Sequence, residues 1–271
     1  MRRYPLPVVV SLAWLVLVAL ATLLAAWLPM QDPTKQSLLN MLAPPSLERW
    51  FGADSLGRDV FSRTIHGFRI SFAVSFGAAA VGLVFGGALG ICAGYFRGWS
   101  ERMILIGVNI VLAFPPLVLI IAMVAYPGEA LLKVVLALGI VYIPTVTRVA
   151  RANTLLFSEK EFVTAARAAG MSDARLIVRE LLPNLVPVLL TYFLLLVAVG
   201  VLAEAGLSYL GLSVPPPVPT LGQMMASEQA NALEAPHAIF FPAGMLFLTI
   251  FALNLVGEEV QRRIDDRAGT A

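Results

Sequence analysis

Charge is what this sequence has least of. Only 13% of its 271 residues are charged, whereas 59% are hydrophobic and the mean hydropathy is +0.83. An ordinary globular domain carries about 25% charged residues. So few charges cannot cover a soluble chain of this size, and a dispersed net charge of +2 lacks the clustered basic face of a nucleic-acid-binding protein. The composition excludes a soluble enzyme, a disordered chain and a disulfide scaffold, and it predicts a protein embedded in the lipid bilayer.

Residues that carry chemistry are also scarce. The single cysteine, Cys92, excludes an internal disulfide, and the two histidines, His66 and His237, are too few and too far apart to predict a metal site. None of the lysines is followed by Ser or Thr, so a G-x-x-x-x-G-K-[ST] phosphate loop is absent. Neither a His-Glu-x-x-His nor a Gly-x-Ser-x-Gly motif occurs. We therefore expect a non-catalytic chain that binds no metal or cofactor.

Long apolar stretches take the place of these motifs. A transmembrane helix needs roughly 20 predominantly apolar residues. Six stretches meet this length, namely 4–31, 70–96, 103–128, 130–150, 181–203 and 235–257. The uncharged stretch 205–227 is interpreted as an external loop, because its four prolines between 215 and 219 prevent a helix in lipid. The predicted fold class is an all-α integral membrane protein with six transmembrane helices.

The distribution of Lys and Arg predicts the orientation. With the N-terminus inside, 13 of these residues are cytoplasmic and 6 are external, so we expect both termini in the cytoplasm. The first stretch follows Arg2 and Arg3 and could be a signal peptide, but its length favours a membrane anchor. We expect three parts: a first helix with an external loop (1–68), a core of five transmembrane helices (69–257) and a cytoplasmic tail (258–271).

A glycine ladder marks the second span. Four glycines recur at four-residue intervals and share one helix face: Gly82, Gly86, Gly90 and Gly94. Absent side chains let a neighbouring helix approach closely, so we expect this face to pack against another helix rather than lipid.

Glu204 is the one acidic residue inside an otherwise apolar stretch. An ionisable group in a span is a functional candidate. Its position near the end of the fifth span predicts a wet external interface. We expect a structural or gate-positioning role there, with direct substrate contact as the alternative.

The charged cytoplasmic loop 151–183 is long for a connection between two spans, and we expect residues 157–183 to form a hairpin within it. The alanine-rich first half of the hairpin predicts a helix that Gly170 ends, and we expect a positive φ at Gly170 where the chain reverses. Ser172 or Asp173 can cap a second helix, which Pro183 ends or kinks. Three arginines form a basic rim: Arg167, Arg175 and Arg179. The alternative is an amphipathic helix on the lipid surface, but the small-residue face favours a close-fitting protein partner.

This loop resembles the cytoplasmic signature of ATP-binding cassette (ABC) importer permeases, which is Glu-Ala-Ala, three residues, Gly, and a distal Leu-Pro. Five positions match: Ala165, Ala166, Gly170, Leu182 and Pro183. Thr164 replaces the usual Glu, which removes one expected contact. Four further segments resemble the C-type subunit of the dipeptide/oligopeptide/nickel permease family: 51–63, 113–116, 202–212 and 254–258.

The resemblance implies a type I ABC importer permease in the bacterial inner membrane. It also implies a homologous B-type permease subunit, an external solute-binding protein, and two cytoplasmic ATPase subunits that bind ATP and Mg. ATPase coupling would involve Phe162, Ala165, Ala166, Arg167, Gly170, Arg175, Leu182 and Pro183. The alternative is a self-contained secondary transporter or channel, but internal repeats are common in carriers and none is found here. Peptides, nickel chelates, opines and glutathione-like molecules all remain possible substrates.

Overall fold

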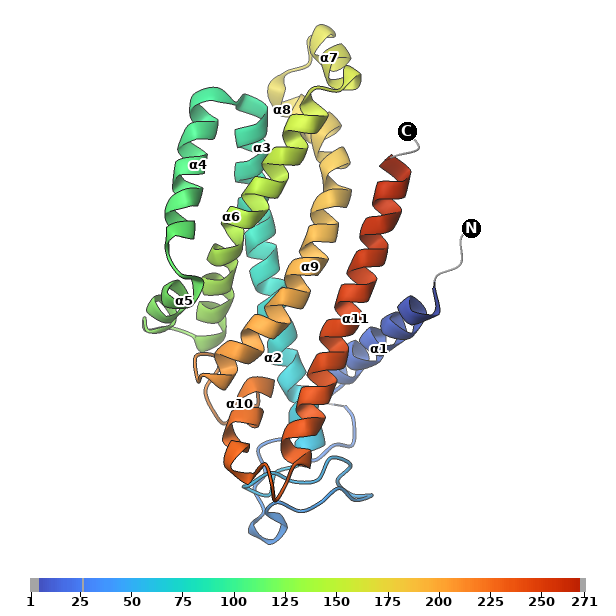
Figure 1. The fold of residues 1–271 in the computed structure, drawn as a ribbon, viewed down its shortest axis with the longest axis vertical. Helices are drawn as coiled ribbons and strands as arrows, with labels where there is room; N and C mark the ends of the chain where they lie inside the picture. The colour runs from blue at the N-terminus through green and yellow to red at the C-terminus, as the bar shows by residue number, and fades with distance from the viewer. Residues whose placement is uncertain (1–4, 26, 269–271) are drawn as a thin grey trace. The chain divides into compact units, whose positions relative to one another are not determined.

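The computed structural model describes residues 5–25 and 27–268, and nearly all of its regular structure is helical (Figure 1). The α-helices are α1 (Leu6–Leu23), α2 (Val60–Val81), α3 (Gly87–Phe96), α4 (Gly98–Ala113), α5 (Pro116–Val124), α6 (Ala130–Ser158), α7 (Glu161–Ala168), α8 (Asp173–Leu176), α9 (Leu182–Tyr209), α10 (Leu221–Ser227) and α11 (His237–Ala268). A π turn joins α2 to α3 and another joins α8 to α9, at Gly82–Gly86 and Ile177–Leu181. Short 3-10 helices occur at Leu38–Asn40 and Gln229–Asn231. One isolated bridge, between Ala53 and Asp59, is the only β-pairing in the described part of the chain.

Among the described residues, five helical segments are long and apolar enough to cross a membrane: Leu6–Leu23, Val60–Phe96, Ala130–Ser158, Asp173–Tyr209 and His237–Ile264. The remaining expected span, the third along the chain, is the pair α4 and α5, which is bent by 83°. The break lies at Phe114-Pro115-Pro116, where Phe114 is extended, with φ −86° and ψ 135°. Proline lacks a backbone donor and disfavours the α conformation of the residue before it. All six apolar segments are thus helical, but the third is a broken span rather than a straight one.

Two helices extend beyond their expected limits. The second span was expected from Ile70, yet α2 already begins at Val60, where the Asp59 carboxylate accepts a hydrogen bond from the Ser62 N–H at 2.7 Å. Such an acceptor satisfies an unpaired donor of the first helical turn and fixes the start of the helix. At the other end, α11 continues to Ala268 through the expected tail. Both expected part boundaries, 68/69 and 257/258, therefore fall inside continuous helices.

The contacts group the chain into two compact units. The first holds the residues up to Phe76, Pro127–Val134 and Val197–Glu258. Its core contains Val18, Phe68, Val201, Ala205, Leu221 and Leu246. Within it, the Trp14 indole of α1 donates a hydrogen bond to the Thr249 hydroxyl of α11 at 3.1 Å, which connects the first and last helices.

The second unit holds Gly77–Tyr126, Val135–Leu196 and the residues from Glu259. Its core gathers side chains from α3, α6, α7, α8 and α9: Ile91, Ala150, Val163, Leu176, Leu181, Leu185 and Leu189. The expected coupling hairpin thus shares one apolar cluster with the helices that carry it.

Candidate coupling and gate sites

The turn between α7 and α8 is a complete helix-ending motif. Gly170 has φ +80°, in the left-handed region that favours glycine. Its N–H donates to the Arg167 carbonyl at 3.0 Å, and the Met171 N–H donates to the Ala166 carbonyl at 3.2 Å. These two bonds are the Schellman pattern, which satisfies the last carbonyls of a helix. The expected positive φ at Gly170 is confirmed.

The second limb of this hairpin differs in part from the expectation that Pro183 ends or kinks it. Pro183 does not end the helix, because α8 continues through the π turn into α9. The wider π turn lies directly before Leu182 and Pro183, and a proline without an N–H cannot complete a regular α turn. Ser172 occupies the N-cap position in an extended conformation, but its side chain makes no capping hydrogen bond.

Burial divides the small-residue face of α7. Val163 and Leu176 are fully buried in the core of the second unit, and Ala166 packs against the same core. Ala165 is exposed, and Phe162 is 36% exposed. Ala166 is therefore half-buried within the chain, because a helix of eight residues must use one stripe to anchor itself. The coupling role of Ala165 and Ala166 stays a prediction.

A tyrosine fastens this segment to the end of α3. The Tyr95 hydroxyl donates a hydrogen bond to Asp173 Oδ1 at 2.5 Å. Arg167 Nη2 approaches the same hydroxyl at 3.5 Å, and its Cζ lies 5.7 Å from the centroid of the Tyr95 ring. The contact is a cation–π interaction, and the hydrogen bond with Tyr95 raises the pKa of Arg167. All three arginines of the rim are exposed, and Arg167 also has contacts with Tyr95 within the chain.

Tyr95 was not predicted from the sequence. It precedes Arg167 by 72 residues, so no local pattern pairs the two. We name Tyr95, Arg167 and Asp173 the tyrosine clasp.

The glycine ladder faces α6 throughout. A Cβ atom at Gly82 would lie 2.7 Å from Tyr142 Cβ, and one at Gly86 would lie 2.7 Å from the Ile143 carbonyl oxygen. The corresponding distance for Gly90 is 2.5 Å, to Ala150 Cβ, and for Gly94 it is 2.8 Å, to Thr154 Cβ. Real Cβ atoms do not approach this closely, so any side chain on this face would push α6 away.

Glu204 is fully buried rather than wet. Its carboxylate accepts hydrogen bonds from the Ser71 hydroxyl of α2 at 2.5 Å and from the Ser213 hydroxyl at 2.9 Å. No Lys or Arg among the described residues forms an ion pair with it. The expectation of a wet interface is wrong because α9 continues past Glu204 to Tyr209 and the chain after it folds back. Glu204 therefore joins α2 to the proline-rich loop, and its gate role stays a prediction.

The proline-rich loop is held against the end of α9. The hydroxyls of Ser208 and Thr220 are hydrogen-bonded, and Ser208 Oγ also accepts the Gln223 N–H at 3.0 Å. A Cβ atom at Gly222 would lie 1.9 Å from the Ala205 carbonyl oxygen, so only glycine allows α10 this approach. The loop thus has a defined path around Glu204.

A buried polar cluster organises the segment before α2. Asp54 Oδ2 accepts from Arg58 Nε at 2.7 Å and lies 3.4 Å from Arg63 Nε. Glu228, which is 1% exposed, accepts from the Ser55 N–H at 3.1 Å and from the Ser55 hydroxyl at 2.7 Å. The motif 51–63 was noted in the sequence, but Glu228 was not, because 173 residues separate it from Ser55.

The chain is similar to known membrane transport proteins. Residues 86–270 match the family described as "Binding-protein-dependent transport system inner membrane component". The chain belongs to this family. It is 37% identical over 223 residues to the glutathione transport system permease protein GsiD of Pectobacterium atrosepticum, which covers 82% of this chain and 74% of that protein. It is 36% identical over 267 residues to GsiD of Escherichia coli, which covers 98% of this chain and 88% of that protein.

The fold is also that of a known transporter subunit. A chain of the MetNI methionine ABC transporter in an inward-facing conformation matches with a TM-score of 0.62 and 19% identity, over 74% of this chain and 96% of that chain. The expected type I importer permease fold is confirmed. The protein is the permease component of an ABC importer, a non-catalytic, multi-pass inner-membrane subunit that works with partner ATPases and a substrate-binding protein.

Proposed function

We propose that this permease forms half of the path for a small peptide and that the exposed side of α7 receives an ATPase subunit. The observation that supports docking is the division of α7 into a buried anchor and an exposed small-residue side. Val163 and Leu176 anchor the segment, and Ala165 leaves room for a close-fitting surface. Such a segment moves with the helices that hold it, as a rigid lever must.

The proposed transporter also contains subunits other than this chain. A homologous B-type permease subunit completes the path, two ATPase subunits bind ATP and Mg, and an external binding protein delivers the substrate. Six apolar segments without a phosphate loop support this division of labour. The relatives named as glutathione permeases favour glutathione or a similarly small peptide over a nickel chelate. Uptake of labelled glutathione by the assembled complex, with dipeptides as competitors, tests the substrate class.

The docking test uses the turn and the exposed face separately. Gly170→Val forces a β-branched residue to φ +80° and should abolish uptake, whereas Gly170→Asn tolerates this region and should retain it. Ala165→Trp adds bulk to an exposed position and should prevent ATPase attachment without disturbing the permease fold. Leu39→Trp, at a 97% exposed position far along the chain, is the matched control.

The readouts are ATPase activity stimulated by loaded binding protein, and uptake, both in the purified complex. Loss of both in Gly170→Val and Ala165→Trp is expected. Normal stimulated hydrolysis with normal uptake in both variants would refute docking at this segment.

A further inference from the structure

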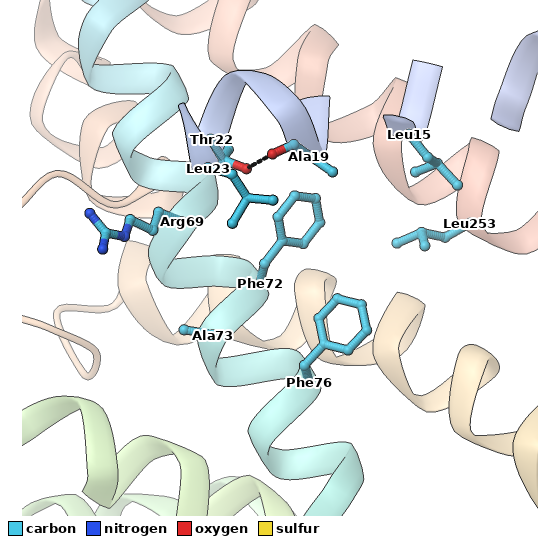
Figure 2. A pocket seen from close by; sticks show the side chains of 9 residues that line it. All are labelled: Leu15, Ala19, Thr22, Leu23, Arg69, Phe72, Ala73, Phe76 and Leu253. Atoms are coloured by element: carbon cyan, nitrogen blue, oxygen red, sulfur yellow. Dashed lines mark hydrogen bonds between the residues drawn. The ribbon is translucent and has the colours of Figure 1, made fainter. Parts of the chain in front are cut away.

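The first unit contains an apolar cavity of about 510 Å³, apart from Glu204 and the tyrosine clasp. It lies between α1 and α2 and reaches Leu253 of α11 (Figure 2). On α2 it is lined by one helix face, from Arg69 through Phe72 and Ala73 to Phe76. This volume is within the range of about 300–1,000 Å³ that small-molecule sites occupy.

The cavity is a slot that runs along the helices. It follows α1 from Leu23 to Leu15 and α2 from Arg69 to Phe76, which is a length of about 11 Å at 1.5 Å per residue. It is open at the protein surface, since Leu23 is 77% and Phe76 is 45% exposed. The Thr22 hydroxyl is turned to the Ala19 carbonyl at 2.8 Å, so this polar group does not interrupt the apolar wall (Figure 2).

Arg69 supplies the one charge of the lining. It is exposed, and no carboxylate of the described residues pairs with it. Figure 2 shows its guanidinium directed away from the rings of Phe72 and Phe76, at the end of the slot near Leu23. The lining is therefore apolar along its length and cationic at one end.

The cationic end lies at the level of the membrane boundary. Arg69 is the last charged residue before the uncharged run 70–96. On α1, the helix ends at Leu23 and is followed by the exposed Trp27, a residue type enriched at the membrane interface. Lipid phosphates lie at this level, and a guanidinium binds phosphate through paired hydrogen bonds.

We propose that this slot binds a phospholipid, with one acyl chain along α1 and α2 and its phosphate on Arg69. The lipid belongs to the membrane face that carries the 31–59 segment. A transmembrane helix of a partner subunit fits less well, because it would have to bring a carboxylate to the boundary to match Arg69. The bilayer supplies both the apolar chain and the anion at the required levels.

The test is native mass spectrometry of the purified complex titrated with dioleoyl phosphatidylglycerol. Arg69→Gln removes the charge, and Ala19→Phe fills the slot from α1. Matched controls are Lys35→Gln, an exposed cation outside the slot, and Ala13→Phe, an exposed position on α1 that does not line it. Size-exclusion profiles confirm that each variant assembles, and Ala73→Phe replaces Ala19→Phe if assembly fails.

One tightly retained lipid per copy of this chain is expected in the unaltered complex and in both controls. Retention should fall about tenfold in Arg69→Gln and in the slot-filling variant, as expected for a lost charge-assisted hydrogen bond. Equal retention in Arg69→Gln would overturn the phosphate contact, and displacement by millimolar inorganic phosphate alone would reveal a free-phosphate site instead. Cross-linking of Ala73→Cys to a second permease subunit would show that a helix fills the slot, which would also overturn the proposal.

Discussion

At the scale of single residues, a local pattern is readable from sequence when its cause is local. The positive φ of Gly170 was predicted because an alanine-rich helix before a glycine is itself a local feature. Glu204 was singled out by its apolar neighbours, but its environment was not, because Ser71 lies 133 residues away. The half-buried state of Ala166 was missed for the same reason, since its neighbours come from other helices.

Glu204 yields the first prediction. Glu204→Gln keeps one acceptor oxygen and places an amide donor against Ser71 or Ser213, so the serine hydroxyl facing the amide must turn to accept, and its hydrogen bond to a charged carboxylate is lost. Loss of a hydrogen bond to a charged group costs about 1.5–3 kcal/mol. We expect lower uptake with intact assembly, measured in vesicles containing the purified complex. Glu234→Gln, an exposed position, is the control, and unchanged uptake in Glu204→Gln would remove any role for this contact.

Asp59 yields the second prediction. Burial raises the pKa of this carboxyl, although the hydrogen bond from the Ser62 N–H opposes the shift. A raised folded-state pKa means that the folded protein binds more protons, so this contribution to stability is present at low pH and is lost as pH rises through the folded pKa. Asp59→Asn retains an N-cap and removes the charge. The difference in thermal unfolding temperature, Asp59→Asn minus unaltered protein, should increase as pH rises from 4 to 7. A decrease in this difference over the same range would contradict the prediction.

At the scale of elements, hydropathy predicted all six apolar segments but not their shapes. The Phe-Pro-Pro of 114–116 was noted as a family motif, yet the stretch was read as a straight span, because hydropathy carries no information on backbone geometry. The start of α2 was placed late because Arg63 and Arg69 were counted against a span. Arg63 lies within the helix and is 2% exposed.

The glycine ladder yields a prediction at this scale. Gly90→Leu should displace α6, since a Cβ atom there would lie 2.5 Å from both Ala150 Cβ and the Thr147 carbonyl oxygen. Overpacking costs typically about 1–3 kcal/mol, and a backbone clash places this variant at the upper end. Gly107→Leu is the control, because nothing lies within 4 Å of a Cβ atom there. Yield and thermal unfolding of the detergent-purified complex are the measurements, and equal values for the two variants would show that the ladder does not require glycine.

At the scale of the whole molecule, the sequence predicted the family but did not predict the contacts between distant segments. Ordered motifs identified an importer permease, and the match over 86–270 agrees. What remained hidden were contacts between distant segments, such as Ser55 with Glu228 and Tyr95 with Asp173. Each of these contacts can be predicted only after the helices have been placed in space. No pattern in the sequence of one chain specifies that placement.

The tyrosine clasp allows the coupling path to be tested within an intact transporter. If α7 and α8 transmit ATPase motion to α3, the contact of Tyr95 with Asp173 and Arg167 should keep the two ends together. Tyr95→Phe removes the hydroxyl but retains the ring under the guanidinium, whereas Tyr95→Ala removes both.

We expect ATPase attachment to persist in both Tyr95 variants, because the exposed face of α7 is unchanged. The ratio of substrate imported to ATP hydrolysed should fall modestly in Tyr95→Phe, which loses only the hydroxyl contacts, and several-fold in Tyr95→Ala, which also loses the cation–π contact. Tyr126→Ala, an exposed tyrosine at the end of the broken span, serves as the control. An unchanged ratio in Tyr95→Ala would mean that the hairpin moves independently of α3, and the buried cluster of Val163 and Leu176 would then have to carry the motion alone.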